Sequence, residues 1–231
     1  MQNLVEVKNL KKSYGLKEAV KGISFKIKDD EILGLLGPNG SGKTTTIGMM
    51  LGLLKPSNGE IIIDGKKIED NRIEILKKIN FISPYIELPK KLTVKQNLIV
   101  YGKLYSVSDI KGRIEYLSEK LRLGDLLSKI TGELSSGQKN RVSLAKALIN
   151  KPKVLLLDEP TASLDPEIGD FVRTFLEDYK KEMKISILLA SHNMNEVTRL
   201  CKSTLMMKDG IIIDSGSPEE LISKHGRQNL E

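Results

Sequence analysis

The sequence predicts an α/β protein with a mostly parallel sheet, an antiparallel β portion beside it and an inserted helical subdomain. Three observations carry this prediction. Short, wholly apolar runs typical of strands buried on both faces alternate with amphipathic helical segments. Two strand pairs that turn at Asp-Gly predict β-hairpins. Residues 84–150 contain a long helical stretch between two apolar strands, and we expect a single domain over residues 1–231.

The N-terminal part is predicted to be rich in β structure. Residues 4–7 alternate apolar and polar side chains and predict a strand, with residues 23–27 as its partner. Residues 33–36 form a short apolar strand that ends in a glycine-rich loop, and a helix should follow from 43 to about 53. Residues 61–68 predict a hairpin around an Asp-Gly turn.

The C-terminal part is predicted to alternate helices and strands. Residues 94–127 are helical in character, with glycines as punctuation, and lie inside the expected subdomain. A proline in the first turn is typical of a helix start, so Pro218 should open a terminal helix. The other expected elements are a strand over 79–82, a helix over 142–149, a strand over 154–157, a helix over 168–183, a strand over 185–190 and a hairpin over 205–213.

Composition excludes several classes of protein. Hydrophobic residues make up 39% and charged residues 29%, which excludes disorder as the main state. The net charge of 37 − 30 = +7 weakly favours an anionic partner. Aromatic residues are only 4% and Trp is absent, which argues against a module that stacks on nucleic-acid bases, so no nucleic-acid partner is expected.

Cellular location can also be narrowed. Cys201 is the only cysteine, which excludes an internal disulfide and is typical of a reducing compartment. The first residues lack the apolar core of a signal peptide, and no run of about 18 apolar residues could span a bilayer. We therefore expect a cytoplasmic protein that needs a separate partner if it works at a membrane.

Residues 37–44 fit the phosphate-loop pattern G-x-x-x-x-G-K-[ST]. Glycines let successive backbone N–H groups point at phosphate oxygens, and the helix that follows presents its positive end to the same anion. Lys43 can reach the β- and γ-phosphates, and the Thr44 hydroxyl can ligate Mg²⁺. The predicted nucleotide-binding set is Gly37, Pro38, Asn39, Gly40, Ser41, Gly42, Lys43, Thr44 and Thr45.

Two carboxylates follow the apolar strand over residues 154–157. The carboxyl end of a buried parallel strand is where ligands of open α/β sheets bind. Asp158 suits the Mg²⁺ shell, and Glu159 suits a general base that polarises an attacking water. The alternative is a charged pair that merely closes a strand, and the phosphate loop in the same chain disfavours it.

With these motifs the sequence resembles the ATP-binding subunits of ABC transporters over essentially its whole length. Residues 134–138, Leu-Ser-Ser-Gly-Gln, resemble the LSGGQ signature, and residues 163–165 resemble the D-loop. His192 matches the switch histidine after a buried strand, and Tyr14 matches the aromatic that stacks on adenine. Each has a structural alternative. Ser135 could be an ordinary helix cap, His192 a satisfied polar residue at a strand end, and Tyr14 a tyrosine near a glycine turn that does not touch adenine.

The resemblance implies a head-to-tail homodimer that holds two ATP molecules and Mg²⁺. Lys43, Glu159 and His192 would be catalytic in one copy, with Asp158 and Thr44 as the metal residues. Ser135 and Gly137 of the other copy would cap the γ-phosphate, and Gln138 belongs to the same nucleotide-binding set. The following helix, beginning near Asn140, would direct its positive end at the same phosphate. Hydrolysis would drive a separate integral membrane permease, which would hold the chain at the inner face of the cell membrane.

Two departures from the family pattern are visible. Ser136 stands where the signature usually has glycine, and its side chain crowds a backbone that should approach phosphate. Ungapped alignment puts Pro84 where the family carries the glutamine of the Q-loop. Proline has no side-chain oxygen for Mg²⁺, so the coupling between nucleotide and permease at this position is expected to differ.

The function class can be narrowed further by the same resemblance. Residues 93–98 and the overall length resemble the drug, lipid or polysaccharide export branch, so an exporter is expected. The alternative is a soluble ABC-type ATPase that acts in cofactor assembly. A nucleotide-binding module without catalysis is disfavoured by the intact Lys43, Asp158, Glu159 and His192.

Overall fold

The structure is a computed structural model that describes residues 3–84, 86–162 and 164–225. Two sheets form its framework. The first has the strand order β2-β1-β4-β5, and its neighbouring strands are antiparallel. Its strands are β1 (Asn3–Tyr14), β2 (Lys17–Lys28), β4 (Asn58–Ile63) and β5 (Lys66–Lys67).

The second sheet has the order β10-β9-β3-β8-β7-β6. The strands from β9 to β6 run parallel, and β10 pairs with β9 in the antiparallel sense. These strands are β3 (Ile32–Leu36), β6 (Ile79–Ile82), β7 (Val154–Asp158), β8 (Ser186–Ser191), β9 (Ser203–Lys208) and β10 (Ile211–Gly216). The mixed parallel and antiparallel architecture confirms the predicted fold class.

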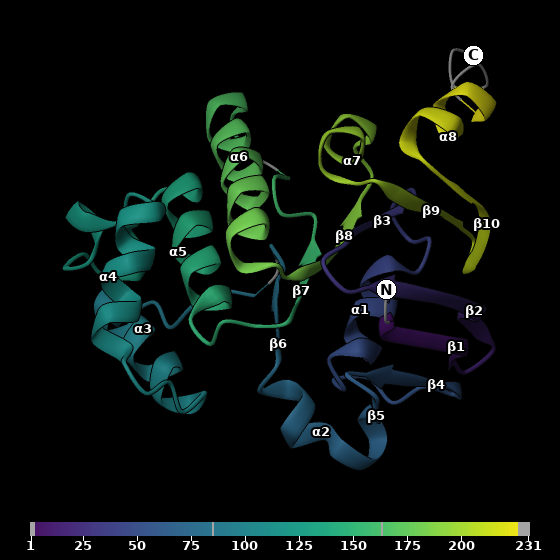
Figure 1. Cartoon of the computed structure of the whole chain (residues 1–231), viewed down its shortest axis with the longest axis horizontal. Coiled ribbons are helices and arrows are strands. Elements are labelled where there is room, and N and C mark those ends of the chain that lie inside the picture. Colours follow the sequence, from purple (N-terminus) through teal and green to yellow (C-terminus); the bar gives the residue numbers. More distant parts are fainter. Residues whose placement is uncertain (1–2, 85, 163, 226–231) are drawn as a thin grey trace.

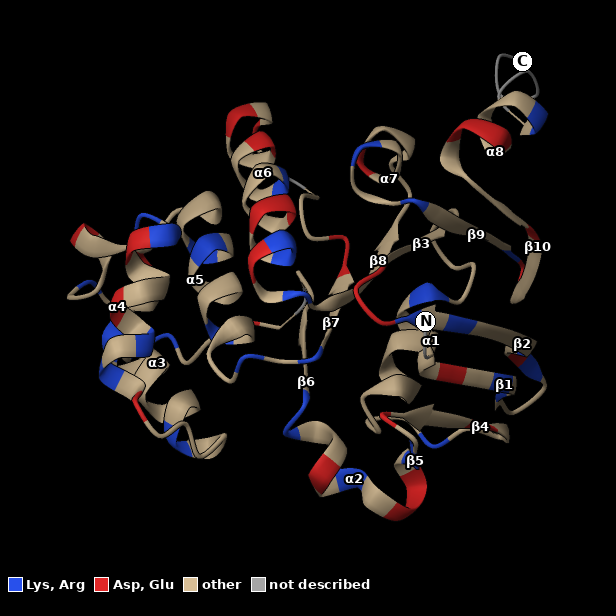
Figure 2. Cartoon of the chain, in the orientation of Figure 1, with Lys and Arg blue, Asp and Glu red and all other residues tan. Residues whose placement is uncertain are grey.

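Helices separate and cover the sheets (Figure 1). The segment that carries α3, α4 and α5 lies on one side of the parallel sheet, and the antiparallel sheet lies on the other. Figure 2 shows acidic and basic residues interspersed along α4 and α6, so the positive surplus is not confined to one helix. The helices are α1 (Lys43–Met50), α2 (Ile68–Leu76), α3 (Val94–Leu104), α4 (Ile110–Lys120), α5 (Ser136–Leu148), α6 (Pro166–Met183), α7 (Met194–Leu200) and α8 (Pro218–His225), with 3-10 turns at Gly124–Leu126 and Thr131–Glu133.

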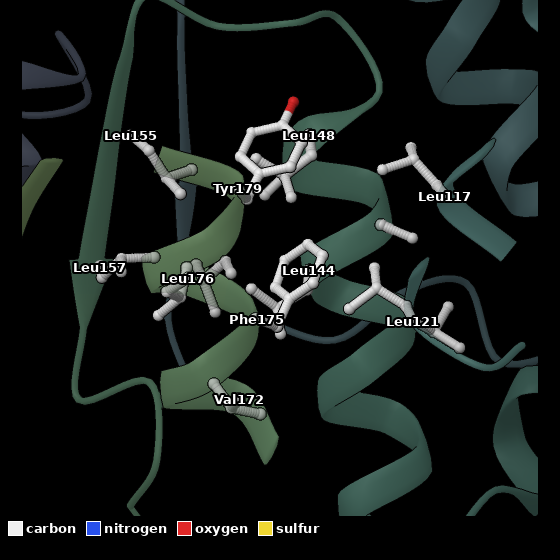
Figure 3. Close-up of a cluster of buried hydrophobic side chains, with 14 of the residues drawn as sticks. Leu117, Leu121, Leu144, Leu148, Leu155, Leu157, Val172, Phe175, Leu176 and Tyr179 are labelled. Atoms are coloured by element: carbon white, nitrogen blue, oxygen red, sulfur yellow. The ribbon is translucent and has the colours of Figure 1, made fainter. Parts of the chain in front are cut away.

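The parallel strands are buried on both faces, and alternate residues belong to two different cores. Leu155 and Leu157 of β7 pack with the helical side, where Figure 3 shows them next to Leu176 of α6, at the opposite edge of the cluster from Leu117 of α4. Val154 and Leu156 pack with α1 and the antiparallel sheet. Each fully buried side chain of this size contributes about 1.5–3 kcal/mol, which explains why the strands are continuous apolar runs.

Some predicted boundaries were wrong. Ile68 was expected to end a hairpin, but it begins α2, which the sequence analysis missed. The helix expected over 142–149, with an N-terminal end near Asn140, begins at Ser136 instead, because Ser135 and Gln138 form a capping box. The stretch 94–127 is divided into α3, α4 and a 3-10 turn. Within the described part of the chain, no helix is both long and apolar enough to cross a membrane.

Candidate functional site

The phosphate loop connects β3 to α1 and passes close to two other backbone segments. A Cβ at Gly37 would lie 2.1 Å from the carbonyl oxygen of Met207, and one at Gly42 would lie 2.7 Å from that of Ala19. Gly42 also has φ of +108° as the N-cap of α1. Only glycine fits these two positions, so the loop keeps its curl around the start of α1.

Lys43 is buried in the first turn of α1, and its ammonium lies inside the loop. Nζ donates to the carbonyl oxygens of Gly37 at 2.6 Å and Pro38 at 3.1 Å. The same atom lies 3.7 Å from Oε1 of Glu159. The arrangement concentrates a positive charge at the loop, between the backbone that can bind an anion and the carboxylate that follows β7.

Asp158 ends β7 and faces Thr44 at the start of α1. The Thr44 hydroxyl donates to Oδ2 of Asp158 at 2.9 Å. Burial raises the pKa of the Asp158 carboxyl, against the opposing effect of that hydrogen bond. Oδ1 is buried and accepts no hydrogen bond from any described residue. A hydroxyl beside a buried carboxylate with a free oxygen is a donor set that fits a hard cation such as Mg²⁺.

Glu159 and His192 form the next pair. Oε2 of Glu159 lies 2.8 Å from Nδ1 of His192, and the Glu159 side chain is 12% exposed whereas that of His192 is 53% exposed. Glu159 has φ of +51°, a left-handed conformation that costs a non-glycine residue about 1–3 kcal/mol. A strained carboxylate held against a histidine at the mouth of the loop is suited to orienting a water molecule.

The remaining residues of the loop surround its opening. Pro38, Asn39, Gly40 and Thr44 are exposed, and Thr45 is half-buried. The Ser41 hydroxyl is buried and has no hydrogen-bond partner among the described residues. Oδ1 of Asp158 also has no hydrogen-bond partner among the described residues, and Oε1 of Glu159 has no hydrogen bond there, only the ion pair with Lys43 at 3.7 Å. These three oxygens indicate a polar ligand at this place.

Tyr14 is the last residue of β1 and is 49% exposed. Lys12 Nζ lies 5.1 Å from the centre of its ring. An aromatic ring with an open face can stack on a nucleotide base, and such stacking is worth about 1 kcal/mol. The adenine contact of Tyr14 stays a prediction.

The signature residues are not brought to the phosphate loop of their own chain. Oγ of exposed Ser135 accepts from the backbone N–H of Gln138, and Oε1 of Gln138 accepts from that of Ser135. Gly137 packs against Ile168 of α6. Across residues 3–84, 86–162 and 164–225, neither polar side chain bonds to the loop. Ser135 is therefore a helix cap. Because it is exposed, a second molecule can also contact it.

The Q-loop and D-loop expectations fall partly outside the described residues, because Tyr85 and Ser163 are not described. Pro84 is exposed and lines a cavity of about 300 Å³ together with Glu159, Ser136 and Leu164. The cavity connects the position after β6 to the Glu159 carboxylate. That Pro84 stands at the metal-facing position of the Q-loop stays a prediction.

Sequence reasoning missed a polar cluster behind His192. Ser191 ends β8, Thr161 follows β7, and both hydroxyls donate to the buried carboxylate of Glu196 in α7 at 2.7 Å. The available signal was an acidic residue in the first helical turn after His192. Its role could not be assigned from the sequence because Thr161 is distant along the chain.

Comparisons with known proteins agree with this geometry. The family described as ABC transporter matches residues 20–162. The ABC transporter ATP-binding protein NatA of Bacillus subtilis (strain 168) is 37% identical and aligns with 92% of this chain and 87% of its own length. The bacitracin transport ATP-binding protein BcrA of Bacillus licheniformis is 34% identical over 100% of this chain and 75% of its own.

Solved structures agree as well. One described as the ATP binding subunit of an ABC transporter has a TM-score of 0.87 and 26% identity, covering 99% of this chain and 95% of that one. A dimeric, post-hydrolysis ATP-binding cassette bound to ADP and Pi has a TM-score of 0.84 and 27% identity, covering 93% and 98%. The chain therefore belongs to the ABC transporter family, as one of its ATP-binding subunits.

Proposed function

We propose that this subunit hydrolyses ATP with the residues around the phosphate loop, and that hydrolysis powers export through a separate membrane permease. The observation that carries the proposal is the continuous contact from Lys43 to Glu159 to His192, at distances of 3.7 and 2.8 Å. A cation, a carboxylate and an imidazole in this order can bind a phosphate, polarise a water molecule and orient it. Export is supported by relatives named for Nod factor export and bacitracin transport.

The chain's own groups divide the work. The loop amides and Lys43 bind and orient the β- and γ-phosphates. The bound phosphates attract the Lys43 ammonium, which then leaves the Gly37 carbonyl. Glu159 accepts a proton from the attacking water, and His192 holds that water and the γ-phosphate in line. Thr44 and Asp158 would hold Mg²⁺, which when bound neutralises charge developing on the phosphates.

The second half of the site comes from a second copy in this proposal. Ser135, Gly137 and the N-terminal end of α5 would cap the γ-phosphate bound by the partner's loop, with the backbone amides at that end directed at the anion. Two copies would then enclose two ATP molecules and separate after hydrolysis. A permease would hold the pair at the inner face of the cell membrane.

The test uses purified protein with Mg-ATP. We expect the parent to hydrolyse ATP and Glu159→Gln to lose about 10²–10⁴-fold in rate, because a general base typically contributes that much. The variant should still bind ATP and elute as a dimer in size-exclusion chromatography. Glu182→Gln, on the far end of α6, is the matched control and should keep the parental rate. Parental hydrolysis by Glu159→Gln would refute the assignment.

The coupling to export is tested separately. If a multi-span membrane protein is encoded in a neighbouring reading frame, it should co-purify with this chain and stimulate its ATPase rate. A chain that hydrolyses ATP but recruits no membrane protein would support the alternative of a soluble ATPase.

A further inference from the structure

Glu196 is a buried carboxylate that the proposed chemistry does not use. It lies in the first turn of α7 and is 2% exposed. Oε1 accepts from the hydroxyl of Thr161 at 2.7 Å, and Oε2 accepts from that of Ser191 at 2.7 Å. In the described residues no lysine, arginine or histidine forms an ion pair with it. Burying a carboxylate without a cation costs free energy, even when two hydroxyls donate to it with good geometry. A carboxylate at this position is therefore unfavourable for stability alone.

The Ser191 contact fixes the segment that carries His192. The same Ser191 hydroxyl accepts from the backbone N–H of Asn193 at 3.0 Å. The Ser191 carbonyl accepts from the N–H of Gly37 at 3.2 Å. The residues on either side of His192 are therefore tied to each other and to the phosphate loop, and the Glu196 carboxylate orients the hydroxyl that makes one of these ties.

The Thr161 contact fixes the segment that carries Glu159. Thr161 is two residues after Glu159, and the N–H of Ala162 closes a turn on the Glu159 carbonyl at 3.2 Å. The N–H of Glu159 donates to the carbonyl oxygen of Ala190 at 2.9 Å. A left-handed glutamate persists only when its surroundings hold it, and the Thr161 contact is one of those restraints.

We propose that Glu196 is a positioning residue that sets the distance between Glu159 and His192 by holding both of their loops on one carboxylate. The inference rests on the proposed function, because it matters for catalysis only if this pair acts on water. A shift of about 1 Å in such a pair can cost as much as about 10²-fold in rate. Removal of the carboxylate should therefore slow hydrolysis without weakening the binding of ATP.

The first experiment separates kcat from KM. We expect Glu196→Ala to lower kcat by about 10- to 100-fold with KM for ATP unchanged. Glu196→Gln should stay within about threefold of the parent, because its amide can bond to both hydroxyls. Glu31→Ala is the matched control, since Glu31 also accepts from a serine hydroxyl, Ser203, but at the opposite end of β3. An equal loss in Glu196→Ala and Glu31→Ala, or no loss in either, would overturn the proposal.

The second experiment is a double-mutant cycle. If Glu196 acts through the Glu159–His192 pair, adding Glu196→Ala to His192→Ala should lower kcat by less than about twofold. A purely structural role would give losses that multiply. Independent losses would therefore overturn the positioning role.

The third experiment does not depend on activity. The chain has two histidines, so ring-proton NMR should give two resolvable signals. In Glu196→Ala we expect the His192 signal to move and that of His225, which contacts Asp214, to stay. An unmoved His192 signal would overturn the inference. If the parent shows no ATPase activity, the proposed function fails, whereas a moved His192 signal still supports the link to Glu196.

Discussion

The phosphate-loop half and the signature half of the candidate site are built differently. In the first half, side chains from three segments of the sequence contact one another and leave buried polar atoms without hydrogen-bond partners among the described residues, such as Oδ1 of Asp158. In the second half, Ser135 and Gln138 satisfy each other in a capping box and face outward. Buried polar groups without hydrogen-bond partners indicate where a polar ligand can bind, whereas a helix start whose cap is satisfied and exposed gives no such indication.

The two halves therefore differ in what they need to bind a nucleotide. The first half already has a cation, a carboxylate pair and a histidine in contact, so it can bind a nucleotide within one chain. The second half contributes only backbone amides and a hydroxyl at the N-terminal end of α5, which become useful when another molecule brings a phosphate to them. This asymmetry is what the head-to-tail dimer requires.

Lys43→Ala should have the largest effect, because the charge inside the loop has no substitute nearby. We expect ATP hydrolysis to fall by at least about 10²–10³-fold and nucleotide binding to weaken. The measurements are steady-state ATPase rates and fluorescent nucleotide titration. Lys153→Ala is the control, since Lys153 pairs with Asp64 at the other end of the parallel sheet. Undiminished turnover in Lys43→Ala would remove this residue from the site.

Ser135→Asp separates the two roles of the signature serine. Aspartate is as good an N-cap as serine, so the midpoint of thermal unfolding should change little. Its negative charge would face the γ-phosphate of the partner copy, so ATP-dependent dimerisation and hydrolysis should fall by about 10-fold or more, while binding to the monomer persists. Analytical ultracentrifugation with Mg-ATP measures the first effect. A dimer of parental affinity would mean that Ser135 is a cap and nothing else.

The sequence was sufficient to predict the half of the site that depends on local patterns. The phosphate loop and the residues that end β7 and β8 could be located because apolar strands are followed directly by polar residues. Helix α2 was missed because only Ile68 and Ile75 are buried, the side chain of its N-cap residue Lys67 makes no capping hydrogen bond, and it is kinked at Asn71. Its formation depends on packing against the antiparallel sheet, which local propensity does not encode.

The predicted start of α5 was wrong for a different reason. The Ser-x-x-Gln pattern of a capping box was present, but it was weighed as an alternative to the signature. The structure shows the cap, and the proposed γ-phosphate contact is compatible with it. Glu196 illustrates the remaining limit, since its partners Thr161 and Ser191 meet only when β7 and β8 pair.

Lys146 lies in the last turn of α5, at the end opposite the signature residues. Its Nζ is buried 4.7 Å from the centre of the Phe81 ring and donates to the Phe81 carbonyl. Burial lowers the pKa of Lys146 to about 8 from 10.5. Between these values the unfolded chain binds more protons than the folded one, so this residue makes the free energy of unfolding rise as pH increases from about 8 to about 10.5.

Lys146→Met should therefore stabilise the protein most below pH 8, by at most about 3 kcal/mol, and lose that advantage above it. Urea unfolding of parent and variant at pH 7 and pH 9.5 measures the difference. A difference that is the same at both pH values would show that Lys146 keeps its ordinary pKa in the fold.

The smallest expected effect concerns Pro84, where the cavity that contains Glu159 meets the segment after β6. A proline supplies no side-chain oxygen, so the metal shell should have one protein ligand fewer, and water should take the place because Mg²⁺ commonly keeps several waters. ATP binding should change little, since the loop amides and Lys43 make most of the phosphate contacts.

Pro84→Gln should then lower the Mg²⁺ concentration needed for half-maximal hydrolysis by a few-fold, about 1 kcal/mol for one added oxygen ligand. The measurement is the ATPase rate against Mg²⁺ concentration at saturating ATP, for the parent and the variant together. Pro89→Gln, five residues further along the same segment, controls for the loss of a proline, because the Pro89 carbonyl that accepts from Asn97 is retained in glutamine. Superimposable curves for Pro84→Gln and the parent would mean that the metal-facing position lies elsewhere in the segment after β6.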